Sequence, residues 1–420
     1  MRQLFDSDTW REIFQSIGKN RLRTFLTMLG VFIGIYIYIA LSGAAKGLDN
    51  GFEKEFETVA RNSMFIWAQT TSKPYAGFKT GRRIQLKLQD AEELRRQVPE
   101  IETLAPRNVS GVFGSSPGVI TRGIKSGNYS VFGDFPEFTK IATKKIYDGG
   151  RFINDEDIKQ ERKVCVIGER TQKELFDVEE NPIGGYLEIE DVSFQVVGVH
   201  KFSGGGPFDN DSDIFIPFTT YKKIYNTGDN VAWFTIAAYD DADVIKVEQD
   251  IKANLRRIHK VDPEDEKAIG SFNLGEQFKK IFGFSNGLTF LSLIVGIATI
   301  LAGVIGIGNI LLISVKERTK ELGVRRALGA TPTEVRNQIL IEALFLTLLA
   351  GIIGIIMGAL TLKGIDVFTQ DVDLPYTNPT VPIPYVIGSL LLMVILGVLI
   401  GLIPAQRAVS IKPIDALREE

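Results

Sequence analysis

The side chains of this 420-residue chain that could act as nucleophiles, acid–base groups or metal ligands are few and far apart. Its single cysteine, Cys165, lies in the apolar run 164–167, and its two histidines are His200 and His259. One cysteine cannot form an intrachain disulfide or a cysteine-based zinc site, and the histidines lack ligand-like spacing. Cys165 is therefore predicted to be a buried strand residue. We expect neither a catalytic site nor a metal site on this chain.

Glu342 is the one charged residue in the stretch 337–362. An ionisable side chain inside a membrane helix is a candidate proton relay. Glu342 follows Arg336 closely, however, which places it near one end of the stretch. We favour a structural or coupling role over proton chemistry, with the proton relay as the alternative.

The most informative short segment is 316–342, KERTKELGVRRALGATPTEVRNQILIE. Glu321 and Arg325 have the i,i+4 spacing of a helix ion pair. Gly329 stands where a C-terminal cap is expected, and 331–334 reads as an N-cap, a proline at N1 and a glutamate at N3. The pattern predicts a short charged helix, a stop at Gly329 and a new helix. The alternative is a solvated loop that only fixes orientation.

Four long stretches with almost no charge must position this segment. A helix rises ~1.5 Å per residue and the hydrocarbon core is ~30 Å thick, so each stretch can cross a bilayer. We predict transmembrane helices at 24–45, 281–315, 337–362 and 382–406. The second would be ~52 Å long as one helix, so it should project beyond the membrane. The mean hydropathy of the whole chain is only +0.08 because the polar segment 46–280 dilutes these stretches.

The loops between these stretches differ in charge. Residues 1–23 and 316–336 are rich in Arg and Lys, whereas the loop 363–381 is acidic. The positive-inside rule places the first two in the cytoplasm and the third outside. Residues 1–23 are predicted to form an amphipathic interfacial helix, with a frayed tail as the alternative. Both termini, including the tail 407–420, are then cytoplasmic, and residues 46–280 lie outside.

The polar segment has the composition of a folded soluble domain. Strand–helix–strand patterns in its two flanks, about 60–128 and 226–275, predict a mixed α/β subdomain. Short apolar runs separated by turn residues predict an inserted β-rich subdomain at about 129–225. The predicted fold class is thus a membrane protein with one transmembrane helix before, and three after, a large α+β extracytoplasmic domain. The net charge of −3 and a pI near 5.8 argue against a nucleic-acid partner.

Two local patterns occur in the first flank of the polar segment. Residues 84–88 alternate between apolar and polar side chains, as in a half-buried strand. Asp90 and Glu93 have the spacing of a capping box, which predicts that a helix opens at Asp90.

Small residues recur at every fourth position in each apolar stretch. They are Gly30 and Gly34 in the first stretch, Ala298, Ala302 and Gly306 in the second, Ala350, Gly354 and Gly358 in the third, and Gly397 and Gly401 in the fourth. Such spacing allows close packing of helices within one chain or between chains. Four spans are too few for a self-sufficient pore or a two-repeat carrier, which favours half of a permease.

The charged segment resembles the inner loop of MacB/FtsX-like ABC transporter permeases. The family pattern is roughly ERxxEIGxRRALGA, followed by an acidic residue in the next span. The residues that carry the match are Glu317, Arg318, Glu321, Gly323, Arg325, Arg326, Ala327, Gly329 and Ala330, with Glu342 as the acid. Similar residues occur at 20–24 (NRLRT) and 404–408 (PAQRA), and the outer segment 194–199 (FQVVGV) is similar to a MacB-type domain.

This resemblance implies a coupling helix at 317–329 that docks on a cytoplasmic ABC ATPase. The ATPase-coupling residues carried over by position are Glu317, Arg318, Glu321, Gly323, Arg325, Arg326 and Gly329. The sequence contains no GxxxxGK[ST] motif, so ATP-Mg is expected on an ATPase that is a separate polypeptide, with no cofactor on this chain. The resemblance also implies a second permease protomer, in a homo- or heterodimer, in the bacterial inner membrane. A periplasmic adaptor and an outer-membrane channel are further partners that it suggests.

The leading hypothesis is a permease subunit that couples ATP hydrolysis to export or extraction of cargo at the outer side of the inner membrane. One alternative is a lipoprotein-releasing permease. Another is a non-transporting, FtsX-like mechanotransmitter that regulates an extracellular partner. The large two-part outer domain favours the MacB type over the smaller FtsX type.

Overall fold

The computed structural model describes residues 21–111, 118–178, 180–201, 210–369 and 374–410. Most of the predicted interfacial helix and of the predicted tail therefore lies outside the described residues. The chain divides into two compact units, which we call the helical unit (Met1–Phe52 and Phe282–Glu420) and the mixed unit (Glu53–Ile281). The sequence prediction drew the corresponding boundaries at 45/46 and 280/281.

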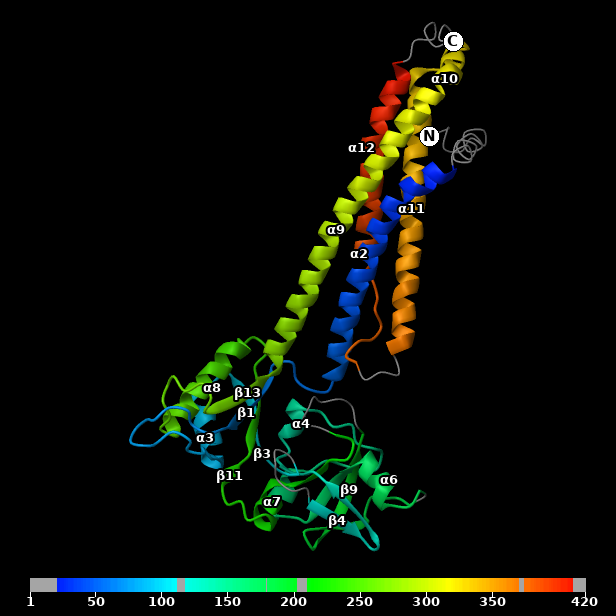
Figure 1. The fold of residues 1–420 in the computed structure, drawn as a ribbon. Helices are drawn as coiled ribbons and strands as arrows, with labels where there is room; N and C mark the ends of the chain where they lie inside the picture. The colour runs from blue at the N-terminus through cyan, green and yellow to red at the C-terminus, as the bar shows by residue number, and fades with distance from the viewer. Residues whose placement is uncertain (1–20, 112–117, 179, 202–209, 370–373, 411–420) are drawn as a thin grey trace. The chain divides into compact units, whose positions relative to one another are not determined.

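The helical unit is built on long helices that run side by side (Figure 1). Its helices are α2 (Arg21–Glu55), α9 (Leu274–Glu317), α10 (Thr319–Ala327), α11 (Pro332–Thr369) and α12 (Ile383–Val409). Among the described residues, all but α10 are long and apolar enough to cross a membrane. Helix α9 has 44 residues, which corresponds to ~66 Å. It is longer than the span 281–315 expected from the sequence.

Glycines allow α2 to approach both α9 and α11. A Cβ atom at Gly30 would lie 2.8 Å from Gly303 Cα, and a Cβ at Gly303 would press on the backbone of Val31. On the other side of α2, a Cβ at Gly354 of α11 would lie 2.9 Å from the carbonyl oxygen of Phe32. Backbone atoms cannot retreat as side chains can, so these contacts require glycine.

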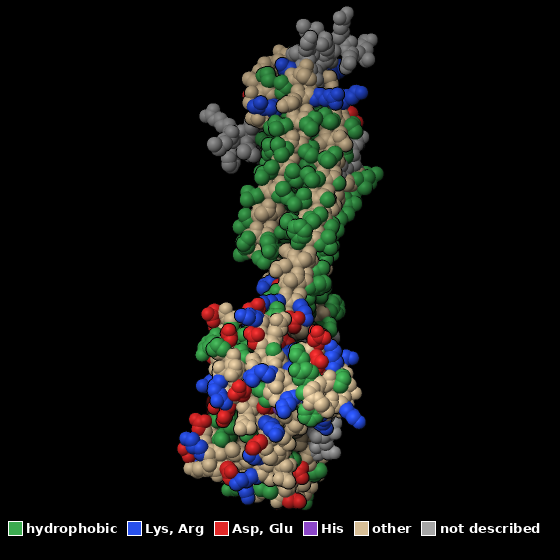
Figure 2. Space-filling view, turned by 90° about the vertical axis from the view of Figure 1, so that its left-hand side faces the viewer, with side chains coloured by type: hydrophobic (Ala, Val, Ile, Leu, Met, Phe, Trp, Pro, Cys, Tyr) green, Lys and Arg blue, Asp and Glu red, His purple; other side chains and the backbone are tan. Residues whose placement is uncertain are grey.

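Helix α12 packs against α11 in a similar way. A Cβ at Gly401 would lie 2.9 Å from Ala343 Cβ, and one at Gly397 would lie 3.3 Å from Thr347 Oγ1. The core between the helices is apolar and includes Ile35, Val304 and Met393. The opposite face of α12 is also apolar: four side chains spaced by four residues are more than half exposed, namely Leu391, Ile395, Leu399 and Ile403. Hydrophobic side chains cover the visible face of the helical unit in Figure 2, as expected of a surface in contact with lipid.

The mixed unit contains an 11-stranded sheet with the strand order β13-β1-β12-β3-β6-β10-β7-β9-β8-β4-β5. Its strands are β1 (Ser63–Ala68), β3 (Ile101–Ser110), β4 (Gly118–Arg122), β5 (Lys125–Tyr129), β6 (Val131–Asp134), β7 (Val164–Gly168), β8 (Tyr186–Ile189), β9 (Val192–His200), β10 (Ile214–Pro217), β12 (Trp233–Ala238) and β13 (Ile269–Asn273). A separate two-stranded ladder joins β2 (Leu86–Lys87) to β11 (Asn230–Val231). The helices are α3 (Leu88–Gln97), α4 (Phe138–Ile141), α5 (Asp155–Lys159), α6 (Glu169–Leu175), α7 (Phe218–Ile224) and α8 (Val244–Ile258).

Strand β3 belongs to both halves of the large sheet. Its first part pairs with β12, and its last three residues, Asn108–Ser110, pair with β6. Helices α3 and α8 pack with the β12 half, where Leu94 and Ile251 are fully buried. The other half has a second apolar core that includes Cys165 and Phe194. The predicted fold class, four membrane-spanning helices with a large α+β domain, is confirmed.

Two local features differ from the sequence prediction. Helix α3 begins at Leu88 rather than at Asp90, because Asp90 Oδ2 accepts a hydrogen bond from the Lys87 amide, at 2.8 Å, and thus closes the first turn from inside the helix. The predicted strand 84–88 is consequently reduced to β2. The hairpin β4–β5 pairs with β8 and contributes Ile120 to the second core. It therefore belongs to the β-rich subdomain, which was predicted to begin only at about residue 129.

A buried ion pair lies where the two halves of the sheet meet. Arg107 Nε and Nη2 donate to the two carboxylate oxygens of Asp134 at 2.6 and 2.8 Å, and the side chains are 2% and 0% exposed. The guanidinium also lies 3.8 Å from the ring centroid of Phe138 and 4.6 Å from that of Phe132. The bidentate pair thus lies beside an apolar cluster that includes Phe132, Phe215 and Trp233 and spans both halves of the sheet.

Candidate functional site at the charged end of the helical unit

Helix α10 is held at one end of the helical unit by a small apolar cluster. Leu322 is buried against Val335 and Ile339 of α11 and against Ala405 of α12. Gly323 is also buried, which lets this face of α10 lie close to its neighbours. Arg326 Nη1 donates a hydrogen bond to the carbonyl oxygen of Val409, at 2.7 Å, and so ties α10 to the end of α12. The short helix is therefore packed against the bundle.

Charged side chains link the junction of α9 and α10 to α11. Arg318 is the single residue between the two helices. Its Nη1 atom lies 3.9 Å from Glu342 Oε2, and its Nε atom lies 3.9 Å from Glu321 Oε2. Glu321 Oε1 in turn lies 2.9 Å from Arg325 Nη2, in the i,i+4 geometry expected from the sequence. Because Glu342 is buried, the pair with Arg318 connects the interior of α11 to the base of α10.

Both ends of the turn between α10 and α11 are capped as the sequence predicts. Gly329 has φ +108°, a conformation that favours glycine at the end of a helix. Thr331 and Glu334 exchange hydrogen bonds: the Thr331 amide donates to Glu334 Oε2 at 2.8 Å, and the Glu334 amide donates to Thr331 Oγ1 at 3.3 Å. With Pro332 as its first residue, α11 starts at a defined position.

The outward face of α10 combines charge with exposed apolar groups. Val324 is 39% exposed and Leu328 is 83% exposed. The adjacent residues Lys320 and Glu321 are exposed in the turn of α10 that precedes Val324. Basic side chains are visible at this end of the unit in Figure 2. A protruding apolar side chain among charged ones is suited to contact with a protein partner.

The cysteine and histidine side chains of the mixed unit do not form one cluster: Cys165 and His200 are buried, and His259 is partly buried. Cys165 is fully buried, and burial raises the pKa of its thiol far above the usual range. Burial, together with the nearby Lys144, lowers the pKa of His200 to about 4. His259 Nε2 lies 2.7 Å from Asp90 Oδ2. No group of three His, Cys, Asp or Glu side chains suited to a metal ion occurs within the described ranges.

Comparison with known proteins assigns both parts of the chain. The MacB-like periplasmic core domain matches residues 24–254, and the FtsX-like permease C-terminal domain matches residues 293–413. The chain belongs to the MacB/FtsX-like permease family. The family predicted from the sequence is thereby confirmed.

Relatives in this family include exporters. The chain is 30% identical to the macrolide export ATP-binding/permease protein MacB of Bdellovibrio bacteriovorus, over 97% of this chain and 61% of that protein. It is 28% identical to the pyoverdine export ATP-binding/permease protein PvdT of Pseudomonas syringae pv. syringae, over 100% of this chain and 60% of that protein. A solved structure of the periplasmic region of MacB from Actinobacillus actinomycetemcomitans aligns with 54% of this chain and 94% of that chain, at 22% identity and a TM-score of 0.42. The chain thus spans about 60% of the length of the two export proteins.

The predicted site residues of this family member fall into two groups. The first group lies together at the charged end and consists of Arg318, Glu321, Arg325 and Glu342. Beside it lie the residues that pack, tie or end α10, namely Gly323, Arg326 and Gly329. Glu317 is the last residue of α9. The predicted packing glycines lie between helices of one chain: Gly30 and Gly34 face α9, Gly354 and Gly358 face α2, and Gly397 and Gly401 face α11. Gly306 is half-buried, and it is Gly303 and Gly296 of α9 that lie against α2.

Sequence reasoning missed several residues that define this end of the protein. Leu322 anchors α10, and Leu328 protrudes from it. A signal was present, because Val324 and Leu328 are apolar, four residues apart and surrounded by charged residues. That spacing defines one side of a helix. Which apolar residues would face inward depended on the neighbouring helices, which the sequence of α10 does not contain.

Proposed function

We propose that the chain is the permease subunit of an ABC exporter and that α10 docks on an ATPase carried by a separate polypeptide. The observation that carries this proposal is the anchoring of α10. A force applied to its outward face passes through Leu322 and the Arg318–Glu342 pair into α9 and α11. Helix α9 is continuous over 44 residues and transmits that displacement along its length. The charged end is cytoplasmic, in keeping with the positive-inside rule.

In this proposal, export is preferred to a pure force relay. The two relatives described above are named export ATP-binding/permease proteins. The mixed unit then acts on cargo that is already on the outer side of the inner membrane. Lipoprotein release would use the same coupling, so the choice of cargo does not alter the role of α10. An adaptor and an outer-membrane channel are partners of the same proposed assembly.

The proposed assembly contains a second permease protomer. The glycine pairs of α2, α11 and α12 contact helices of the same chain. They are therefore occupied and do not form the surface between protomers. The exposed apolar side chains of α9, such as Phe290, Ile294 and Ile305, are available for that contact.

Docking of the ATPase is tested by substitution on the outward face of α10. The full chain, affinity-purified from its native membrane, is assayed with a photoreactive ATP analogue for labelling of a separate, co-purifying polypeptide. We expect Val324→Asp with Leu328→Asp to abolish co-purification of the labelled polypeptide, because a charge replaces the protruding apolar contact. Leu374→Asp is the matched control, since Leu374 is a 54% exposed leucine on the loop between α11 and α12. Unchanged recovery of the labelled polypeptide with the α10 variant contradicts docking there.

The orientation is tested by side-specific labelling. Cys165 is buried, so the native protein gives a low background with a membrane-impermeant maleimide. Leu328→Cys and Val178→Cys place new thiols at strongly exposed positions of the helical and mixed units. In cells with a permeabilised outer membrane and an intact inner membrane, we expect the maleimide to label the cysteine at position 178 and not the one at position 328. Labelling of both from the same side contradicts the proposal.

A further inference from the structure

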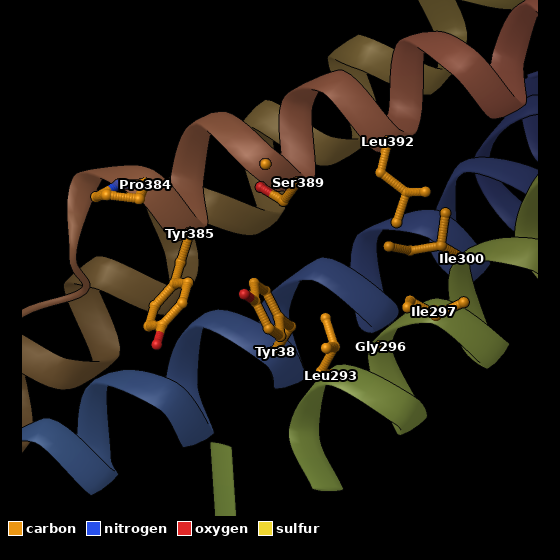
Figure 3. Close-up of a pocket in the computed structure, with 10 residues that line it drawn as sticks. Tyr38, Leu293, Gly296, Ile297, Ile300, Pro384, Tyr385, Ser389 and Leu392 are labelled. Atoms are coloured by element: carbon orange, nitrogen blue, oxygen red, sulfur yellow. The ribbon is translucent and has the colours of Figure 1, made fainter. Parts of the chain in front are cut away.

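A cavity of about 270 Å³ lies among helices α2, α9 and α12 (Figure 3). Its walls come from Leu293, Ile297 and Ile300 of α9 and from Tyr385 and Leu392 of α12, with Tyr38 of α2 between them. The α12 residues belong to the first three turns of that helix, which starts at Ile383. The cavity therefore lies away from α10, toward the other end of the helical unit.

Missing side chains at glycines create this space. A Cβ atom added at Gly388 of α12 would meet no atom within 4 Å, because it would project into the cavity. On the facing helix, Gly296 lets the Tyr38 side chain pack against the backbone of α9: a Cβ there would lie 3.1 Å from Tyr38 Cβ. Tyr38 is only 7% exposed and so forms the floor of the cavity.

The lining is apolar except for hydroxyl groups. None of the ten lining residues is charged, which excludes a site for an ion or for a charged head group inside the cavity. The Ser389 hydroxyl donates to the carbonyl oxygen of Val386, at 2.8 Å. The rings of Tyr38 and Tyr385 face each other edge to face, with centroids 6.4 Å apart, as Figure 3 shows.

The surroundings of the cavity determine its occupant. Its rim residues Leu293 and Tyr385 are 40% and 41% exposed, and the exposed side chains Ile387 and Leu391 continue the same apolar surface on α12. In a membrane-spanning helix this surface contacts lipid chains, not water. A vacant apolar cavity would forfeit dispersion contacts along its walls, whereas a flexible hydrocarbon chain from the bilayer would restore them.

We propose that this cavity binds one fatty acyl chain of a bilayer phospholipid. The chain enters between α9 and α12 and lies against Leu293, Ile300 and Leu392. The phenol hydroxyls of Tyr38 and Tyr385 donate hydrogen bonds to the ester carbonyl at the top of the chain. Tyrosine suits this role because its ring contacts hydrocarbon while its hydroxyl reaches the polar boundary of the bilayer.

The site is tested on the full chain reconstituted in phospholipid nanodiscs that contain a tracer phosphatidylethanolamine with a diazirine in one acyl chain. After irradiation, adducts are mapped by mass spectrometry. We expect adducts on the lining residues Leu293, Ile297, Tyr385 and Leu392 to exceed those on Ile395 and Leu399. The latter two are exposed to lipid on an open face of α12. Equal labelling of the open face and of the cavity residues overturns the proposal.

Two glycine variants separate cavity occupation from general lipid contact. Gly388→Phe fills the cavity, so adducts within it should be lost while those on the open face remain. Gly364→Phe is the matched control on α11: its Cβ also meets nothing within 4 Å, but it lies outside the cavity lining, so the pattern should not change. Cavity adducts that persist in Gly388→Phe overturn the proposal.

A second test addresses the tyrosine hydroxyl groups without filling the cavity. In competition against the tracer, a diester phospholipid should displace cavity labelling about thirtyfold better than its diether analogue, the effect of two hydrogen bonds of ordinary strength. The preference should disappear in Tyr38→Phe with Tyr385→Phe. A photoreactive diacylated peptide tests the other source of an acyl chain. If that peptide labels the cavity and the phospholipid does not, the site belongs to cargo and the phospholipid proposal is overturned.

Discussion

Arg318 Nη1 lies 3.9 Å from Glu342 Oε2, so the residue that joins α9 to α10 meets the buried acid of α11. Glu342 is 6% exposed, and an unpaired charge at such a position is costly. The contact gives Glu342 a structural partner at the base of α10. It favours the coupling role expected for this residue over a proton relay.

A charge swap distinguishes these two roles. Glu342→Ala should lower the free energy of unfolding of the helical unit by about 1–2 kcal/mol, since the pair is long and Arg318 is partly exposed. Arg318→Glu combined with Glu342→Arg restores an ion pair and should recover most of that loss, together with ATP-driven activity of the reconstituted complex. Thermal unfolding and ATP hydrolysis are the measurements. A double variant that is stable but inactive would indicate that an acid at position 342 is required for proton transfer.

Close packing of α2 on α9 should depend on Gly303. A side chain there would press on the backbone of Gly30 and Val31, which cannot move without separating the helices. We expect Gly303→Val to destabilise the purified full chain by about 1–3 kcal/mol, a typical cost of overpacking. Gly364→Val is the control because it also places Val on a long apolar helix but meets nothing within 4 Å. Equal thermal unfolding of the two variants contradicts the packing described.

The pH dependence of stability should include a contribution from His200. Burial lowers the pKa of His200 to about 4, against ~6.5 in an unfolded chain. Between these values the unfolded chain binds the additional proton, so the free energy of unfolding falls as the pH is lowered from 6.5 to 4. The contribution lost is about 3 kcal/mol.

His200→Phe removes this titration while keeping an aromatic ring beside Phe215, whose centroid is 5.0 Å from that of His200. As the pH falls from 7 to 4, the free energy of unfolding of the wild type should therefore decrease more than that of the variant. Chemical denaturation of the full chain, followed by fluorescence, measures it. A difference that does not vary with pH over this window contradicts a buried, neutral His200.

The sequence predicts the elements of this protein better than the contacts between them. Charge-free length identified the spanning helices, and the residues from Gly329 to Glu334 predicted the turn before α11 because caps depend on a few neighbouring residues. The four-residue spacing in α9 suggested Gly306, whereas Gly303 makes the close contact. The difference arises because several small residues of α9 allow close approach, and the position of α2 selects among them.

The mixed unit shows the same limit. The apolar residues of α8, which include Val247, Ile251 and Leu255, recur at helical spacing and are buried, because helical periodicity is a local property of the sequence. The β4–β5 hairpin could not be assigned to a core from its own sequence, since its partner β8 lies some sixty residues further on. Arg107 gave no signal at all: a single arginine in a strand is usually exposed, and only the approach of Asp134 makes its burial possible.

The Arg107–Asp134 pair provides a final prediction, on the mixed unit. Arg107→Ala should destabilise the unit by about 3–5 kcal/mol, because it leaves Asp134 buried without its bidentate partner and removes the stacking on Phe138. Arg107→Met with Asp134→Leu removes both charges and should recover most of the loss, since apolar residues of similar size often replace buried pairs at little cost. Trp233, whose ring centroid is 5.5 Å from Arg107 Cζ, reports unfolding of this region by fluorescence. If the double variant is no more stable than Arg107→Ala, the pair fixes the junction of the two sheet halves by its geometry and not only by neutralising a buried charge.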